Sequence, residues 1–246
     1  MYELMKRKFK PELLKIPIPE RDGILELMSP EYACGENKKF MKMYNWMSIG
    51  YDFVEQQLGK IKYKNKIKEM RKDMISELEW KNGARVLVVS IGTGRDLDFI
   101  PSGTDLKTLD LTGIDISMGM LKKCKRKWRA YPNFLMIHGC AEDLPFKNNQ
   151  FDIVFHVGGI NFFNDKVRAI KEMLRVARKN TKLMIADETD ILVDELYNKT
   201  IFAGHYIGNQ QVDLSHVESC IPKNVCEKKT KLLWDGKFYC ITFRKP

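Results

Sequence analysis

The chain has 246 residues, of which 44% are hydrophobic and 30% charged, and its formal net charge is +10. This length and apolar content suit one α/β domain with additions. No apolar run approaches the roughly 18 to 20 residues of a membrane span, which argues against an integral membrane protein. The six cysteines form no Cys-x-x-Cys pair, so the sequence predicts no metal site and favours reduced thiols in the cytoplasm.

The excess of lysine and arginine raises the question of a nucleic-acid partner. Most basic residues are scattered among acidic ones, and the exception is the run from Lys122 to Arg129. Leu121, Cys124 and Trp128 keep helical spacing through that run. Its charges are therefore expected on the outer face of a core helix. A nucleic-acid partner is not expected, and RNA is kept as the alternative.

The first part of the chain is predicted to be irregular and then helical. Residues 1 to about 35 have little periodicity and several prolines, which predicts an irregular arm and no signal peptide. Helical spacing begins at Asn37, pauses at Gly50-Tyr51-Asp52 and then resumes. A longer amphipathic helix is expected from Lys60 to Leu78, and Asn82-Gly83 supplies a left-handed stop.

The next segment organises the rest of the chain. Arg85 to Val89 has the continuous apolar pattern of a strand buried on both faces, and a Gly-x-Gly turn follows at Gly92 and Gly94. Glycine there permits positive φ and lets a ligand touch the backbone. A second strand ends in Asp115, whose carboxylate is placed to accept both hydroxyls of a ribose. A nucleoside-containing cofactor is therefore expected across the carboxyl ends of two parallel strands.

Two common phosphate-binding motifs are absent from this turn. The dinucleotide fingerprint needs a third glycine, where this chain has Leu97. No Gly-Lys-Ser/Thr follows either, so the turn is not a P-loop.

Later elements extend the same alternating pattern. Ser117 is expected to cap a helix that begins at Met118. Strands are predicted at 134–138, 151–157 and 182–188. A helix is predicted at 168–179, with its inward face at Val167, Ile170, Leu174 and Ala177. A final hairpin, 225–233 and 237–244, turns at Asp235-Gly236 with type I′ geometry. The fold class is α/β, with a doubly wound, mostly parallel seven-stranded sheet.

Four motifs stand in order along the chain, namely Gly92-Thr93-Gly94-Arg95-Asp96, Gly113-Ile114-Asp115-Ile116-Ser117, Ala141-Glu142-Asp143-Leu144-Pro145-Phe146 and Phe151-Asp152-Ile153-Val154. Together they resemble the class I S-adenosylmethionine-dependent methyltransferases, above all the ubiquinone/menaquinone C-methyltransferase-like (methyltransferase type 11) branch. The segment 169–177 is similar to a helix of that branch. The resemblance covers residues 84–190, with a weaker likeness at 44–52. It implies a Rossmann-like domain at 60–246 behind an N-terminal arm and helical lid at 1–59, and S-adenosylmethionine as cofactor.

The resemblance also implies a set of cofactor-binding residues: Tyr44, Tyr51, Ser90, Gly92, Thr93, Gly94, Asp96, Asp115, Ile116, Met118, Cys140, Ala141, Glu142 and His156. Ser90 and Cys140 stand where the family tends to carry acids, and Asp96, Glu142 or Asp143 are candidates to compensate. Met118 would cover one face of the adenine, or else pack in the core. Tyr44 and Tyr51 would hydrogen-bond the methionine carboxylate or line the substrate pocket. The alternative is that both rings only pack the helices together.

The end of the fourth strand, His156 to Phe163, is where sulfonium and acceptor are expected to meet. No Asn/Asp-Pro-Pro-Tyr stands there, which argues against an enzyme that methylates amino groups of nucleic acids. His156 and His205 are candidate general bases. The alternative for His156 is that it is a hydrogen-bonded residue in the wall of the site. Two acids, Asp187 and Glu188, arrive at the site from the fifth strand. Residues 191–222 are expected to select the substrate.

The reaction implied is in-line methyl transfer to a carbon, oxygen, sulfur or nitrogen atom of a small-molecule acceptor, driven mainly by positioning and exclusion of water. The alternatives are an RNA methyltransferase, a non-catalytic S-adenosylmethionine-binding module, and an enzyme that uses a decarboxylated or carboxylated relative of this donor. A homodimer is left open. Asp115→Ala is expected to weaken cofactor binding by about 1–3 kcal/mol. Gly94→Val is expected to block binding sterically while leaving the fold largely intact.

Overall fold

The structure is a computed structural model that describes residues 2–58, 64–131, 133–196 and 212–246. Its strands are β1 (Glu20–Arg21), β2 (Ile24–Glu26), β3 (Arg85–Val89), β4 (Asp110–Asp115), β5 (Leu135–His138), β6 (Ile153–Val157), β7 (Lys182–Glu188), β8 (Cys226–Leu233) and β9 (Phe238–Arg244). Its α-helices are α1 (Tyr2–Lys8), α2 (Gly35–Leu58), α3 (Lys64–Ser76), α4 (Met118–Lys127), α5 (Lys166–Val176), α6 (Asp190–Leu196) and α8 (Leu214–Cys220). Short 3-10 helices are η1 (Pro11–Leu14), η3 (Arg95–Phe99), η4 (Leu106–Thr108) and η5 (Ile160–Phe162).

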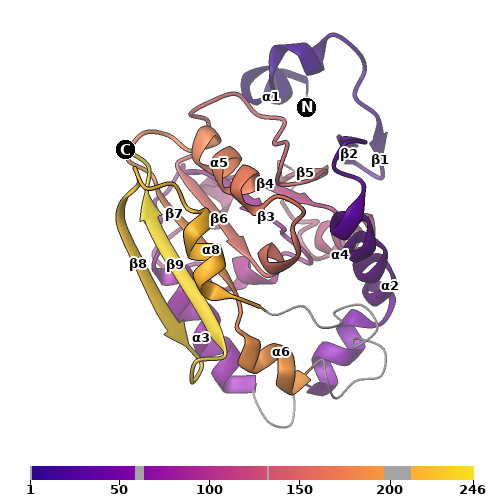
Figure 1. The fold of residues 1–246 in the computed structure, drawn as a ribbon. Helices are drawn as coiled ribbons and strands as arrows, with labels where there is room; N and C mark the ends of the chain where they lie inside the picture. Colours follow the sequence, from indigo (N-terminus) through magenta and orange to yellow (C-terminus); the bar gives the residue numbers. More distant parts are fainter. Residues whose placement is uncertain (1, 59–63, 132, 197–211) are drawn as a thin grey trace.

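The strands form one sheet in the order β1-β2-β5-β4-β3-β6-β7-β9-β8 (Figure 1). β3 lies at the centre and pairs in parallel with β4 and β6. The predicted α/β fold is confirmed, and the seven predicted strands correspond to β3 through β9. Within these seven, β9 runs antiparallel to both of its neighbours, β7 and β8.

Helices cover both faces of the sheet, so the central strands are buried on each side. On one face, Met74 of α3 and Leu121 of α4 pack against Val86 and Val88 of β3. On the other face, α5 and α8 cover a second apolar cluster that contains Leu87 and Val89. This two-sided burial explains why β3 reads as an unbroken apolar run. In the described part of the chain, no helix combines the length and the apolar character needed to cross a membrane.

The N-terminal arm is not irregular, and this prediction was wrong. β2 pairs in parallel with β5 at Leu25↔Ile137, and β1 folds back onto β2 through Asp22-Gly23. Both turn residues have positive φ, as a type I′ turn requires. Strands of two and three residues are too short to show an alternating pattern, so periodicity could not reveal them. The sheet therefore has two strands more than the seven predicted.

Two helix predictions need correction. α2 runs through Gly50-Tyr51-Asp52 without a break, although glycine inside a helix costs about 1 kcal/mol relative to alanine. In α5 the inward residues are Ala169, Ile170, Met173 and Val176, while Val167 is 39% exposed. α5 ends at Val176, so Ala177 is buried just beyond the helix.

The predicted C-terminal hairpin is present. The backbone N–H of Lys237 donates to the carbonyl of Trp234, and Asp235 and Gly236 between them both have positive φ. This is the type I′ turn expected from Asp-Gly. The long amphipathic helix is described from Lys64, and it ends at Ser76, well before the Asn82-Gly83 stop.

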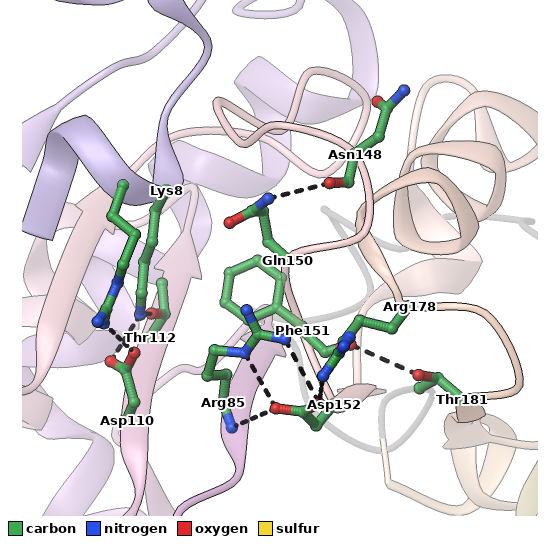
Figure 2. A network of polar contacts seen from close by, with 11 residues as sticks. Lys8, Arg85, Asp110, Thr112, Asn148, Gln150, Phe151, Asp152, Arg178 and Thr181 are labelled. Carbon is green, nitrogen blue, oxygen red and sulfur yellow. Dashed lines mark hydrogen bonds and ion pairs between the residues drawn. The ribbon is translucent and has the colours of Figure 1, made fainter.

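A polar network closes the amino-terminal edge of the sheet (Figure 2). The buried Lys8 Nζ of α1 donates to Asp110 Oδ1 at 2.6 Å and to Thr112 Oγ1 at 2.8 Å. Beside it, the carboxylate of Asp152 accepts hydrogen bonds from Arg85 and Arg178. Burial raises the pKa of Asp152, but these hydrogen bonds outweigh burial and hold that pKa at about 2. This network anchors the N-terminal helix on the edge of the sheet opposite the glycine turn.

Candidate active site

A cleft opens at the carboxyl-terminal edge of the sheet, where the turns after β3, β4, β5 and β6 meet α2. Asn37, Phe40 and Tyr44 of α2 contribute to its lining. Ten of the predicted cofactor residues line the same cleft: Tyr44, Ser90, Gly92, Thr93, Asp96, Asp115, Ile116, Cys140, Ala141 and Glu142. The fold therefore brings together motifs that are separated by almost a hundred residues in the chain.

The glycine turn after β3 leaves room for a ligand. Gly92 has φ +56°, and among the described residues, its two chain neighbours apart, no atom lies within 4 Å of the position that a Cβ would occupy. A ligand can therefore rest directly on the backbone at Gly92. The N–H of Gly92 donates to Asp115 Oδ2 at 2.7 Å, and the N–H of Ser117 donates to Asp115 Oδ1 at 2.8 Å. Burial raises the pKa of Asp115 to about 6, against the effect of these hydrogen bonds.

Gly94 has a different role from the one predicted. It does not line the cleft, and a Cβ at this position would stand 2.6 Å from Trp128 Nε1 and 2.8 Å from Cys124 Sγ. The carbonyl of Gly94 accepts a 3.0 Å hydrogen bond from Trp128 Nε1. Because the missing side chain makes room for α4 and the residue that follows it, Gly94→Val would disrupt packing. The expectation that this change leaves the fold intact is therefore wrong.

Two further residues differ from the expectation at the adenine end of the cleft. Met118 begins α4 and packs against the core cluster on the α3 side, while Met120 lines the cleft instead. Helical side chains lean toward the N-terminus of their helix, so a residue within the first turn can reach the strand ends. Asp143, a candidate to replace the missing acid, forms an ion pair with Lys10 at 3.0 Å.

Cys140 and Glu142 lie side by side in the lining but offer a ligand different chemistry. Burial raises the pKa of the Cys140 thiol to about 12, so this side chain stays uncharged at neutral pH. Glu142 is buried, and its Oε1 accepts a 2.9 Å hydrogen bond from Asn37 Nδ2. This contact ties α2 to the turn after β5.

Two asparagines of α2, Asn37 and Asn45, hold this helix over the cleft. Asn37 and Asn164 exchange hydrogen bonds, each backbone N–H donating to the other side-chain oxygen at 3.2 Å. Eight residues further along, Asn45 Oδ1 accepts from Ser117 Oγ at 2.8 Å and from the Gly119 N–H at 2.9 Å. Ser117 also caps α4 as predicted, because its hydroxyl accepts from the Met120 N–H. Sequence patterns gave no signal for these asparagine contacts.

An ion pair stands at the other end of the glycine turn. Asp96 pairs with Arg71 of α3, and both residues line the cleft. Asp96 can therefore not act as a simple replacement for the acid that is missing at Ser90. Ser90 itself has φ +55°, an uncommon value for a residue other than glycine.

His156 does not lie on the cleft surface. Its side chain is fully buried in the sheet, and its ring packs edge-on against Phe163 with centroids 5.3 Å apart. Neither ring nitrogen has a hydrogen-bond partner among the residues that the structure describes. Burial lowers the pKa of His156 to about 3, so the ring is uncharged at neutral pH. The structure supports neither of its predicted roles, as base or as cofactor contact. His205 and the side chain of Tyr51 lie outside what the structure describes.

The remaining lining comes from the segment after β6, from the last residue of β7 and from the first residue of β9. Gly158 and Gly159 follow β6 with positive φ, and space is open beside Gly158. Aromatic rings and one carboxylate complete this end: Phe162, Phe163, Phe238 and Glu188. The segment 156–163 and the two acids of β7 were expected here, whereas no pattern marked Phe238 or Arg71.

Asp187 orders the loop after β6 in the same way that Asp115 orders the loop after β3. Its Oδ2 accepts from the Gly159 N–H at 3.0 Å and from the Asn161 N–H at 3.1 Å. Burial raises the pKa of Asp187 to about 6. Two buried carboxylates thus fix the two loops that border the cleft.

Residues 87–185 match a family described as a methyltransferase domain. The chain contains a methyltransferase domain. The chain is similar to the demethylmenaquinone methyltransferase of Renibacterium salmoninarum, with 39% identity over 106 residues. The matched region makes up 43% of this chain and 41% of that protein. It is also similar to the demethylmenaquinone methyltransferase of Staphylococcus carnosus, with 32% identity over 143 residues, 58% of this chain and 57% of that protein. The chain thus spans about half the length of the curated relatives it matches.

The fold of this methyltransferase domain is shared with solved structures. A Thermotoga maritima S-adenosylmethionine-dependent methyltransferase, described as a possible histamine N-methyltransferase, superposes with a TM-score of 0.61 at 16% identity, covering 86% of this chain and all of that chain. At this identity the likeness establishes the fold, which is that of the class I methyltransferases.

Proposed function

We propose that the chain is an enzyme that transfers a methyl group from S-adenosylmethionine to a small molecule with an aromatic, quinone-like ring. The observation that carries this proposal is the hydrogen bond between Gly92 and Asp115 in the lining of a cleft within a methyltransferase domain. The similarity to demethylmenaquinone methyltransferases supports a ring acceptor.

The cofactor fits the residues present. The open backbone at Gly92 accepts close approach by a ligand, and Asp115 stands where ribose hydroxyls can donate to its carboxylate. Ile116, Met120 and Ala141 line the cleft; the first two would supply apolar surface for the adenine, and the backbone of Ala141 would supply its polar contacts. When bound, the sulfonium supplies an electrophilic methyl group. The protein's own part is alignment of the two reactants and exclusion of water beneath α2.

Two basic side chains of the helix α4 form ion pairs within the chain. In the basic helix α4, Lys127 pairs with Asp98 at 2.5 Å and Lys122 pairs with Asp22 at 2.9 Å. Both contacts tie α4 to neighbouring segments of the same chain. The six cysteines are free thiols, which supports a cytoplasmic setting for the reaction.

Titration calorimetry with S-adenosylmethionine tests the cofactor assignment, and we expect saturable binding at one site. Gly92→Val is the matched control, because its side chain enters the cleft and should abolish binding. Transfer of a labelled methyl group to 1,4-naphthohydroquinone, with total RNA as a parallel acceptor, tests the acceptor class. Failure to bind the cofactor would favour a non-catalytic role, and labelling of RNA alone would favour the nucleic-acid alternative.

A further inference from the structure

We infer that Asp187 is a positioning residue for the methyl acceptor. Its buried carboxylate fixes the shape of the acceptor loop, residues 158–163, against which the acceptor ring would lie. This inference rests on the proposed function and adds to it the residue that shapes the acceptor end of the cleft. In the described part of the chain, Asp187 is not among the residues that line the cleft, whereas the acceptor loop contributes two glycines and two phenylalanines. Asp187 therefore acts by holding the groups that meet the acceptor.

The carboxylate of Asp187 receives backbone N–H groups from two segments. Its Oδ2 accepts from the Gly159 N–H at 3.0 Å and from the Asn161 N–H at 3.1 Å. Its Oδ1 accepts from the Glu188 N–H at 2.9 Å. The side chain is 1% exposed, so water does not compete for these hydrogen bonds. Hydrogen bonds to a carboxylate are among the stronger ones, and here they hold two peptide groups of the acceptor loop in one orientation.

The position of Asp187 on β7 explains why it meets this loop. Successive side chains of a strand point to opposite faces of the sheet. Leu183 and Ile185 share the face of Asp187 by this alternation, and both belong to the core cluster on the α5 side. The acceptor loop leads from β6, the neighbour of β7, toward α5. Because the loop crosses to the face on which Asp187 lies, the carboxylate can reach its N–H groups.

A second set of contacts holds the same loop from β9. The Asn161 side chain donates from Nδ2 to the Glu188 carbonyl at 3.0 Å, and its Oδ1 accepts from the Tyr239 hydroxyl at 3.1 Å. Tyr239 is fully buried and stands opposite Asp187 in the register of β7 and β9. The acceptor loop is thus tied to two strands through both its backbone and a side chain. Supporting hydrogen bonds of this kind keep a site in one geometry.

Held in this shape, the acceptor loop gives its two phenylalanines different surroundings. Phe162 is buried and stacks on Phe40 of α2, with ring centroids 4.2 Å apart and an interplanar angle of 22°. Phe163 is only partly buried and packs edge-on against His156. At Gly158, its chain neighbours apart, no atom of the described residues lies within 4 Å of the Cβ position. The loop therefore offers an aromatic side chain beside bare backbone, which suits a flat ring.

Loss of the Asp187 contacts should affect the acceptor and spare the cofactor. At the cofactor end, Asp115 plays the corresponding part, because it accepts from the Gly92 N–H in the turn after β3. The two carboxylates stand on different strands, β4 and β7, and hold different loops. A misplacement of one reactant on the order of 1 Å can cost about 100-fold in rate. A displaced acceptor loop should therefore lower acceptor binding and alignment, with the cofactor site unchanged.

Asp187→Asn tests the inference, because it keeps the size of the side chain but turns an amide N–H toward backbone donors that now meet oxygen. With 1,4-naphthohydroquinone as the acceptor, we expect kcat/KM for the acceptor to fall about tenfold or more. The dissociation constant of S-adenosylmethionine should stay within about twofold of wild type. Equal losses of acceptor turnover and cofactor binding, as a merely structural role would produce, or no loss of either, would overturn the inference.

Asp105→Asn is the matched control for this change. Asp105 also accepts a backbone N–H, that of Lys107 at 3.0 Å, but it is exposed at the start of η4 and away from the cleft. Both kcat/KM and cofactor affinity should be unchanged in this control.

Tyr239→Phe is a milder variant that remains informative if Asp187→Asn fails to fold. It removes only the hydroxyl that donates to Asn161, and the ring still fills its place in the core. We expect kcat/KM for 1,4-naphthohydroquinone to fall about threefold, with the dissociation constant of S-adenosylmethionine unchanged. Wild-type kcat/KM in this variant would contradict the inference.

A binding measurement that needs no turnover separates this inference from the proposed function. 2-Naphthol carries a flat ring and a hydroxyl group, and it can be titrated by calorimetry into protein saturated with S-adenosylhomocysteine. We expect wild type and Asp105→Asn to bind it equally, Asp187→Asn to bind it about tenfold more weakly, and Tyr239→Phe to lie between them. This pattern without methyl transfer would refute the proposed reaction and still support the role of Asp187. Equal binding by all the proteins, or no binding by any, would overturn the inference.

Discussion

The backbone N–H of Gly92 donates a 2.7 Å hydrogen bond to Asp115 Oδ2, and this contact joins the turn after β3 to the end of β4. The same carboxylate also accepts from Ser117 at the start of α4. Asp115 therefore holds the shape of the glycine turn in addition to facing the cleft. Its raised pKa gives this double role a measurable consequence.

Binding of S-adenosylhomocysteine should weaken as the pH falls through about 6, the pKa of Asp115. A protonated carboxyl has less acceptor capacity for the hydroxyls of a ribose, so the affinity should fall by up to about tenfold per pH unit below that value. Asp115→Asn should bind more weakly at pH 7 and show a flatter pH profile. Calorimetry between pH 5 and 8 measures both. Equal pH profiles in wild type and Asp115→Asn would remove Asp115 from the binding site.

The two glycines of the turn should respond differently to alanine. Gly92→Ala places a methyl group in open space, so the protein should still fold. Its free energy of unfolding should fall by about 1–2 kcal/mol because of the positive φ, and it should bind the cofactor poorly. Gly94→Ala drives a methyl group against Trp128 and Cys124, so the loss of stability should be larger, about 3 kcal/mol or more. Urea unfolding and calorimetry on both variants test this contrast. Equal stability losses would contradict the assigned roles.

His156→Leu should retain methyl transfer within a few-fold, because the buried ring does not reach the cleft. The pKa of His156 is lowered from 6.5 to about 3 in the folded chain, so the unfolded chain takes up a proton first as the pH falls. The stability that this group contributes is present above pH 6.5 and is lost toward pH 3. Between pH 7 and pH 5, the free energy of unfolding of the leucine variant should therefore fall by about 2 kcal/mol less than that of wild type. Urea unfolding at the two pH values checks this, and a large loss of activity in the variant would restore His156 as a catalytic candidate.

Lys8→Met should destabilise the fold by about 3 kcal/mol, because it leaves Asp110 and Thr112 without their buried cation. Arg7 contacts the same carboxylate from the surface, where its side chain is 64% exposed. Arg7→Met is thus a matched control that should cost less than about 1 kcal/mol. Thermal unfolding of the pair tests whether the N-terminal helix is an integral part of the domain. Equal effects of the two changes would show that burial of Lys8 is of little energetic importance.

Much of the fold could be predicted because it depends on local patterns. Strands buried on both faces read as apolar runs, as in β3, and a glycine turn followed by an acid marks the carboxyl ends of β3 and β4. The short strands β1 and β2 carried too few residues to be seen, although the Asp22-Gly23 turn between them has the same sequence as the one correctly predicted at Asp235-Gly236.

Within the candidate site, the sequence determined which residues follow which strand, and therefore which end of the sheet carries the chemistry. Only the tertiary structure decided where the side chains point. It turned Gly94 toward Trp128, buried His156, assigned Asp187 to the loop after β6 and left Glu188 in the cleft. It also brought Asn37 to Glu142, 105 residues away. Such contacts depend on how strands and helices pack across the sheet, and periodicity within one segment carries no information about that packing.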